Sequence, residues 1–337
     1  MSLDKILLGH GSGGILSQKL IDEVFVPAFS NSKLSPLNDQ AVFELPKGKI
    51  AFSTDSFVVN PLFFPGGNIG DLAVNGTVND VSMCGAVPKF LSCGFILEVG
   101  FEIEKLKTIV NSMTEAAQKA EIQIVTGDTK VVEQRGKEPQ IFINTSGIGV
   151  LPEGIEISAE KAQEDDVIIL SGSIAEHGIT ILSQREGFGF EIPFSSDTAP
   201  LNKIVAKLVS AIPEIHVMRD ATRGGVASVL NEIAESSNVG IKIEEEKIPV
   251  KEAVQGACEM LGLEPVYVAN EGCFVMILPA KHSEKALEIL KNDSVSKDAV
   301  IFGKVVSEHK RMVLLRTFLG SERILQRLQG EQLPRIC

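Results

Sequence analysis

Apolar residues recur along the chain with two different spacings, one typical of helices and one typical of strands. Leu106, Ile109, Val110 and Met113 follow the spacing that places side chains on one face of a helix. We expect helices over residues 15–29, 68–84, 106–120, 179–185, 201–211, 225–235, 253–261 and 284–291, the second of them capped by Asn68. We expect strands over residues 6–8, 41–45, 50–55, 90–99, 122–126, 141–150, 167–170, 240–243, 274–278, 299–306 and 312–315. Such alternation predicts an α/β or α+β fold.

The pattern also divides the chain, whose 337 residues are enough for two ordinary domains. A looser acidic segment, residues 152–166, separates two halves that each alternate strands and helices. Pro46-Lys47-Gly48 stands between two short strand-like runs and predicts a hairpin. The predicted parts are an N-terminal loop and helix (1–35), an N-terminal domain (36–151), a C-terminal domain (160–316) and a flexible tail (317–337).

Composition and charge exclude several classes of protein. With 44% hydrophobic and 23% charged residues the chain is globular, and a net charge of −12 without tryptophan disfavours nucleic-acid binding. No apolar run approaches the roughly 18 residues that a membrane span needs. The five cysteines lack a CxxC pair, and the N-terminus lacks the features of a signal peptide. We therefore expect a cytoplasmic protein without a disulfide framework or structural zinc.

A glycine-rich loop lies close to the N-terminus and has the sequence Gly9-His10-Gly11-Ser12-Gly13-Gly14. Glycine amides can close around an anion, and a following helix adds a favourable dipole, so the loop predicts a phosphate clamp. The spacing formally matches GxGxxG, but no acidic residue follows a second strand as a dinucleotide fold requires. A glycine-rich lead without a ligand is the alternative interpretation.

Four aspartates stand close to strand ends or within motifs of small residues. They are Asp39, Asp55, Asp80 and Asp128. Magnesium prefers carboxylate oxygens and usually bridges them to substrate phosphates. The set predicts a magnesium site if the fold brings the four side chains together, whereas each aspartate alone is typical of a turn or a helix cap.

Asn75 and Asn79 lie four residues apart in the predicted helix that contains Asp80, so they share one face with each other. An amide face beside Gly76 suits contact with a nucleotide or with a metal-bound water. A solvated helix face is the alternative.

Loops in the second half of the chain carry further candidates. Arg223, Gly224 and Gly225 precede a predicted helix and would form a second anion site. His177 and Glu271 occupy similar loop positions. Each of these residues taken alone is also typical of an ordinary cap or turn.

The last residue, Cys337, differs in kind from these candidates. Cysteine is usually buried, whereas a chain terminus is usually exposed. A prenylation signal would need cysteine four residues from the end. Arg335 favours the thiolate, although the terminal carboxylate opposes it. A carrier thiol is the functional interpretation, and an incidental or redox-active exposed thiol is the alternative.

Taken together, these motifs resemble the HypE family of hydrogenase maturation factors, within the aminoimidazole ribonucleotide synthetase-like (PurM-like) superfamily. The resemblance covers essentially the whole chain. It is most specific over residues 9–14, 53–67, 72–80, 125–132, 217–225 and the ending Pro334-Arg335-Ile336-Cys337. Gln40 and Ala221 stand where the family would have Ala and Pro, and neither departure removes a polar group.

The resemblance implies a PurM-like two-domain fold. In that fold the N-terminal half supplies a mixed sheet that pairs across a homodimer into a β-barrel, and the C-terminal half forms α/β layers. It also implies an enzyme that uses ATP to dehydrate a carbamoyl group carried on Cys337, giving a thiocyanate for the cyanide ligands of nickel-iron hydrogenase. The implied partners are the carbamoyltransferase HypF and the iron-carrying HypC–HypD complex.

The resemblance implies roles for the candidate residues as well. Glu271 would remove the amide protons, and Lys130 would orient or polarise the carbamoyl group on Cys337. Mg²⁺ would be held by Asp39, Asp55, Asp80 and Asp128. ATP would be held by Gly11, Ser12, Gly13, Gly14, Asn75, Asn79, Arg223, Gly224 and Gly225.

Other members of the superfamily and other classes of protein are the alternatives to this interpretation. A selenophosphate synthetase would place a cysteine in the glycine-rich loop, and residues 9–14 contain none. A thiamine-monophosphate kinase or a purine-pathway synthetase has no reason to end in cysteine. A non-enzymatic thiol carrier and a nicotinamide oxidoreductase stay open, and ATP hydrolysis and NAD binding would discriminate them.

Overall fold

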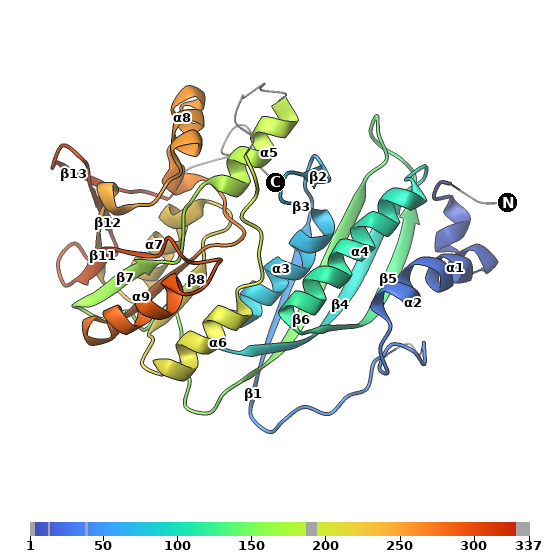
Figure 1. The fold of residues 1–337 in the computed structure, drawn as a ribbon, viewed down its shortest axis with the longest axis horizontal. Coiled ribbons are helices and arrows are strands. Elements are labelled where there is room, and N and C mark those ends of the chain that lie inside the picture. The colour runs from blue at the N-terminus through green and yellow to red at the C-terminus, as the bar shows by residue number, and fades with distance from the viewer. Residues whose placement is uncertain (1–3, 13, 38–39, 187–193, 328–337) are drawn as a thin grey trace.

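The computed structural model describes residues 4–12, 14–37, 40–186 and 194–327 (Figure 1). Within those segments the strands form a four-stranded sheet, a seven-stranded sheet and a short pair, β2 (Phe63–Phe64) with β3 (Gly67–Asn68). Helices pack on both larger sheets, so the mixed fold of helices and strands expected from the sequence is confirmed.

The N-terminal domain is built on the four-stranded sheet, whose order is β1-β6-β4-β5. Its strands are β1 (Lys49–Phe57), β4 (Val87–Glu98), β5 (Gln123–Val132) and β6 (Ile141–Leu151). β4 and β5 run parallel, whereas β6 is antiparallel to β1 and β4. Helices α3 (Ile69–Ser82) and α4 (Ile103–Ala120) lie along one face of this sheet (Figure 1). Asn68 caps α3 as the sequence predicts, because its side chain accepts the Gly70 amide at 2.8 Å.

The N-terminal helices lie against β5. The helix expected over residues 15–29 forms as α1 (Ile15–Leu20), a π-helical turn η2 (Ile21–Phe25) and α2 (Val26–Phe29). Pro27 explains the break, because its nitrogen has no hydrogen to continue the regular helical ladder. The strand expected at residues 6–8 is absent, and a 3₁₀ helix, η1 (Leu8–Gly11), begins there instead.

The hairpin expected around Pro46 does not form. Residues 41–48 contain no strand, and β1 pairs with the distant strand β6 rather than with residues 41–45. Phe43 packs instead against Phe90 of β4, with ring centroids 4.2 Å apart. Contact of this half-buried ring with the sheet takes the place of the local strand pairing that the turn residues predicted.

The C-terminal domain is built on the seven-stranded sheet, with the order β13-β12-β9-β11-β7-β10-β8. Its strands are β7 (Asp166–Leu170), β8 (Val217–Asp220), β9 (Gly240–Glu244), β10 (Phe274–Pro279), β11 (Val300–Val306), β12 (Val313–Arg316) and β13 (Glu322–Ile324). Its helices are α5 (Glu176–Glu186), α6 (Asn202–Ala211), α7 (Gly225–Ser236), α8 (Glu252–Leu261) and α9 (Ser283–Lys291). Short 3₁₀ turns are η3 (Glu245–Lys247), η4 (Pro265–Tyr267) and η5 (Ala280–His282).

Alternate residues of this sheet enter different cores. Ile168 and Leu170 belong to the core that contains α7, whereas Ile169 belongs to the core that contains α6 and α9. A strand that is covered on both faces has apolar residues at consecutive positions, and β7 shows this pattern over residues 167–170.

The first eleven residues of the predicted tail, 317–327, are part of the C-terminal domain. Residues 317–327 are not free, because β13 pairs with β12 and Leu325 is fully buried in the C-terminal core. The Tyr267 hydroxyl donates to the Gln326 carbonyl at 3.0 Å, and the Asn231 amide donates to the Leu325 carbonyl at 3.0 Å. The chain is therefore anchored as far as residue 327.

None of the helices in the described segments combines the length and the apolar character that a membrane crossing requires.

Candidate active site between the two domains

A cavity of about 190 Å³ lies where the two domains meet. β1 and α3 of the N-terminal domain form one side, and the end of β8 with the loop after it, the first turn of α5 and the loop before β10 form the other. The ionisable side chains that line it are Asp55, Asp80, Asp220, Glu271, His177 and Arg223. The cavity is therefore strongly acidic.

Helix α3 contributes to the cavity through one stripe of residues. Leu72, Gly76 and Asp80 are spaced four apart and all line it. Gly76 is required at this point, because a Cβ atom there would lie 2.9 Å from the Phe57 ring of β1. The small residue lets the helix approach the strand closely enough to place Asp80 beside Asp55.

The strand β1 presents Asp55 on the same side as α3. Asp55 pairs in register with the buried Thr145 of β6, and its face of the sheet is the one that the helices cover. Two residues earlier, the Ser53 hydroxyl donates to Asp80 Oδ2 at 2.9 Å. Burial, followed by the charge of Asp55, raises the pKa of Asp80, and this serine bond opposes the shift.

Carboxylates of the C-terminal domain face this pair. Burial, then the charge of Asp80, raises the pKa of Asp220 from 3.8 to about 7, with Arg219 opposing. Burial, then the charges of four aspartates, raises the pKa of Glu271 well above its ordinary value. Such mutual repulsion between enclosed carboxylates is relieved when positive charge enters the cavity.

Buried hydrogen bonds hold the loops that carry Asp220 and Glu271. The Asn270 side chain donates to the Ala221 carbonyl at 2.7 Å and accepts the Ala175 amide at 2.7 Å. Ala175 has a φ of 73°, a conformation that non-glycine residues rarely adopt, and it directly precedes α5. Asn270 thus ties three loops together at one side of the cavity.

Asp197 fixes the backbone of Glu271 from outside the cavity lining. Its carboxylate accepts the Glu271 amide at 3.1 Å and the Gly272 amide at 2.9 Å. Burial raises the pKa of Asp197 to about 6, and these backbone bonds oppose the shift.

The amide face predicted to contact a nucleotide lies in the seam between the domains. Asn79 donates to the Ala199 carbonyl at 3.0 Å and accepts the Leu201 amide at 2.8 Å, so both ends of its amide have protein partners. Asn75 donates to the Thr198 hydroxyl at 3.2 Å, and its buried oxygen has no partner within the described chain. Asn79 therefore links the two domains. Of these two side chains, that of Asn75 is the one with a polar atom that no described residue hydrogen-bonds.

The loop predicted as a second anion site is built by two left-handed glycines. Gly224 and Gly225 have φ values of 77° and 60°, and a Cβ on Gly225 would lie 2.5 Å from the Val266 carbonyl oxygen. The Gly225 amide is taken by the Thr222 carbonyl at 2.9 Å. The exposed Arg223 side chain at the cavity is therefore the part of this motif that suits an anion.

The glycine-rich loop lies elsewhere, against β5. A Cβ on Gly11 would lie 2.7 Å from the Val131 nitrogen, so glycine permits close contact with this strand. The Ser12 hydroxyl donates to the Gly9 carbonyl at 2.9 Å, and Gly14 precedes α1 as its N-cap residue. Gly13 lies outside the described residues.

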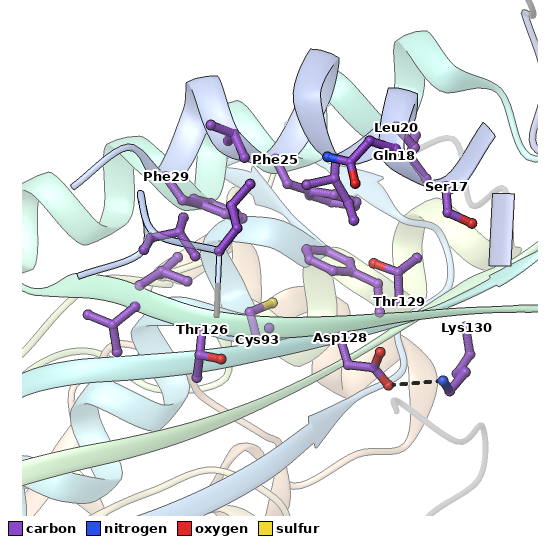
Figure 2. Close-up of a pocket in the computed structure, with 18 of the residues that line it drawn as sticks. Ser17, Gln18, Leu20, Phe25, Phe29, Cys93, Thr126, Asp128, Thr129 and Lys130 are labelled. Carbon is purple, nitrogen blue, oxygen red and sulfur yellow. Dashed lines mark ion pairs between the residues drawn. The ribbon is translucent and has the colours of Figure 1, made fainter. Parts of the chain in front are cut away.

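A second and larger cavity, of about 380 Å³, opens beside this loop (Figure 2). It lies between the N-terminal helices and strands β4 and β5, with Leu20, Phe25 and Phe95 among its apolar lining. Gly11, Asp128 and Lys130 belong to its lining as well. The Lys130 ammonium group lies 3.5 Å from Asp128 Oδ2, and both side chains are exposed.

The predicted four-aspartate set is not assembled within one chain. Asp128 pairs in register with Gly94 and points away from the helices (Figure 2), whereas Asp55 faces them. β5 and β1 are also opposite edges of the sheet, three strand spacings or about 14 Å apart. Asp39 and Cys337 lie outside the described residues. In the described segments no three His, Cys, Asp or Glu side chains form a ready metal site.

Sequence reasoning missed two acidic residues of this site, Asp220 and Asp197. Asp220 ends β8, a strand of four residues that was not predicted, because the motif around it indicated only the helix that follows. Asp197 stands in an irregular segment whose only signal was a polar run, Ser195–Thr198. Repeated aspartates at strand ends gave a signal for the first residue, but none for the second.

Comparison with known proteins follows the same two-domain division. Residues 37–151 match the family described as AIR synthase related protein, N-terminal domain. Residues 163–315 match AIR synthase related protein, C-terminal domain. The carbamoyl dehydratase HypE of Azotobacter vinelandii is 51% identical over 328 residues, which are 97% of this chain and 96% of that relative.

Solved structures agree with the sequence relatives. The crystal structure of hydrogenase maturation protein HypE in complex with ATP matches with a TM-score of 0.94 and 48% identity, over 98% of this chain and 99% of that chain. A chain of the HypE–HypF complex matches with a TM-score of 0.80 and 51% identity, over 92% of this chain and 99% of that chain. Because identity is high over nearly the full length, the chain belongs to the HypE family of the AIR synthase-related proteins.

Proposed function

We propose that the protein is a carbamoyl dehydratase that consumes ATP to convert a carbamoyl group on Cys337 into a thiocyanate. Relatives carry the name carbamoyl dehydratase, and a similar structure binds ATP. The observation that carries the proposal is the cavity at the domain seam, where Asp55, Asp80, Asp220 and Glu271 are gathered.

ATP is needed because an amide oxygen is a poor leaving group. In the first step the carbamoyl oxygen attacks the γ-phosphorus, the new O–P bond forms, and ADP leaves with the electrons of the broken P–O bond. One N–H proton is lost as the imidate phosphate forms. In the second step the remaining N–H proton goes to a base, the C≡N bond forms, and the C–O bond breaks to release phosphate. The net change is transfer of one oxygen and two hydrogens from the carbamoyl group to the phosphate products and solvent.

Mg²⁺ fits the acidic side of the cavity, because several carboxylates line it and their charges add to the burial that raises the pKa values of Asp80 and Asp220. Asp55, Asp80 and Asp220 are the described residues that would hold it. When bound, the ion would neutralise charge on the triphosphate.

Glu271 is the proposed base. In the absence of ligands, burial and then the charges of Asp197 and Asp220 raise the pKa of this carboxyl group well above its ordinary value, which favours the protonated form. Positive charge entering the cavity would lower that pKa, because the aspartate charges that raise it would then be balanced. Asp197 holds the Glu271 backbone through two amides, so the carboxyl group keeps its position while its protonation changes.

A homodimer would bring the two separated halves of the site together. The sheet face that the helices leave open carries exposed apolar side chains, with Phe52 67% exposed and Ile50 55% exposed. If two such faces close into a barrel, β5 of one subunit lies beside β1 of the other. The strand that carries Asp128 and Lys130 in one subunit would then be the neighbour of the strand that carries Asp55 in the other, and both subunits would contribute residues to the site at this boundary.

The larger cavity suits the adenosine part of ATP. Its apolar lining and its volume of about 380 Å³ can enclose a base and a sugar, and the glycine-rich loop stands beside it. The nucleotide phosphates would then leave the cavity near Lys130 and extend toward the acidic cluster. Lys130 would orient the carbamoyl group, as the resemblance implies.

The partners that we propose for this protein are inferred from the chemistry of the reaction and from the complex of a similar protein. A similar chain was crystallised with HypF, so we propose a HypF-type carbamoyltransferase as the donor. Delivery of cyanide to a HypC–HypD complex stays a prediction from the family resemblance. The described cysteines are free thiols, which agrees with a reducing cytoplasm as the compartment.

Intact mass spectrometry tests the proposal. The protein is incubated with a HypF-type enzyme and its carbamoyl donor, then with ATP. We expect a carbamoyl adduct that loses one water only when ATP is added, and no adduct on the variant Cys337→Ala. An adduct that persists on this variant, or an adduct that ATP leaves unchanged, would contradict the proposal.

A further inference from the structure

His177 is a buried side chain of the cavity to which neither the sequence nor the proposed chemistry gives a role. It is 3% exposed, it begins α5 together with Glu176, and the Phe64 ring packs edge-on against it at 5.6 Å. It also lines the acidic cavity. An imidazole enclosed on one side by an aromatic ring and open on the other to a cavity has a fixed orientation.

Hydrogen bonds indicate which ring nitrogen carries the proton. Nδ1 lies 2.8 Å from the Ser196 hydroxyl, and that oxygen accepts the Thr198 amide at 3.2 Å. For the hydroxyl hydrogen, Nδ1 is the acceptor that the described chain provides. Nδ1 is then unprotonated, the hydrogen sits on Nε2, and within the described residues the only hydrogen bond of this ring is the one at Nδ1.

Burial also lowers the pKa of His177 to about 4. The ring is therefore neutral near neutral pH, and it can donate a hydrogen bond without transferring its proton. Its neighbours in the cavity are mainly carboxylates, which accept hydrogen bonds when ionised. His177 would therefore bind the oxygen of an amide, which accepts a hydrogen bond, while the carboxylates would bind its NH₂ group, which donates.

The segment that holds His177 also holds Glu271. Ser196 bonds the imidazole, while Asp197 accepts the Glu271 amide at 3.1 Å. Ser196 is itself fixed to the N-terminal domain, because its amide donates to the Pro65 carbonyl at 2.8 Å. Two neighbouring residues thus set the positions of a hydrogen-bond donor and a proposed base in one cavity.

We propose that His177 is a substrate-binding residue, whose Nε2–H donates a hydrogen bond to the oxygen of the carbamoyl group. The inference rests on the proposed function. The oxygen keeps a second lone pair while the first attacks phosphorus, and negative charge grows on it when the C–O bond breaks. A preorganised donor stabilises that charge.

Two substitutions of similar size test the roles of the two ring nitrogens of His177 one at a time. His177→Gln keeps an amide N–H near the place of Nε2, whereas His177→Asn keeps a polar group near Nδ1 and removes the donor from the cavity. The assay is the single-turnover rate of ATP-dependent water loss from the carbamoylated chain, read by intact mass, together with ATP affinity and thermal midpoint.

We expect His177→Asn to lower that rate by roughly 100-fold or more, with unchanged ATP affinity, and His177→Gln to retain most of it. Ser196→Ala, which frees the ring, should lower the rate several-fold at constant ATP affinity. Equal rates in the Asn and Gln variants, or a parental rate in the Asn variant, would overturn the inference. Water loss that fails in the parent protein would remove the proposed function, and this inference with it.

Discussion

Asp220→Asn tests whether burial of Asp220 and its repulsion by Asp80 lower the stability of the folded protein when no ligand is bound. Asp220 has a pKa of about 7 in the folded protein instead of 3.8, chiefly because of burial and then because of Asp80. The folded state therefore binds more protons than the unfolded chain between about pH 4 and pH 7, and stability falls as pH rises through that window. Asn resembles the protonated form, since it can still donate toward Asp80.

The size of the effect follows from the shift. A difference of about 3 pKa units corresponds to about 4 kcal/mol at most, fully present at about pH 8 and absent at about pH 4. For a chain of this size each kcal/mol moves Tm by roughly 2 °C, so the variant should melt up to roughly 8 °C higher at about pH 8.

Thermal unfolding of the ligand-free parent and variant at several pH values is the assay. The exposed Asp298→Asn serves as the matched control and should leave the parental pH dependence in place. Added Mg²⁺ should raise the Tm of the parent more than that of Asp220→Asn. The reasoning is refuted if Asp220→Asn is less stable than the parent at about pH 8, or if its advantage is the same at both ends of the pH range.

Three further substitutions test the construction of the site. Asn79→Ala should destabilise the protein by about 1–3 kcal/mol in urea unfolding, because the buried Leu201 amide loses its acceptor; an unchanged midpoint would contradict this bond's role. Gly225→Ala should destabilise by roughly 2 kcal/mol or more, since the new methyl group meets the Val266 carbonyl in a left-handed conformation, whereas Gly154→Ala, which meets no atom, should cost less. Phe52→Glu should convert the proposed dimer into a monomer in sedimentation velocity, and a dimer that persists would place the interface elsewhere.

Local patterns were enough to predict most helices and strands. Asn68 and the spacing of Leu106, Ile109 and Met113 predicted α3 and α4, because caps and helical periodicity depend on neighbours in sequence. The hairpin at Pro46 failed because β1 pairs with β6, about ninety residues away. Pairing over that distance leaves no mark in the turn residues.

The site was only partly predictable, because its residues are also brought together from distant parts of the sequence. The fold brings Asp55 and Asp80, which were grouped by motif, to one cavity, while the magnesium site stays a prediction. Asp128 was grouped with them by motif, but register places it on the opposite face and edge of the sheet. Asp197 acts through backbone amides from a segment without regular structure, a role that composition cannot signal.

The account's central claim is that a complete site needs the carboxylates of two subunits. Mixed dimers of Asp55→Asn and Asp128→Asn chains, isolated through two different affinity tags, test it through ATP-dependent water loss from the carbamoylated tail. A site shared between subunits leaves one intact site in each mixed dimer, so we predict about half of the parental activity, while each pure variant is inactive. Mixed dimers as inactive as the pure variants would show that Asp55 and Asp128 act within one chain, and would contradict the account.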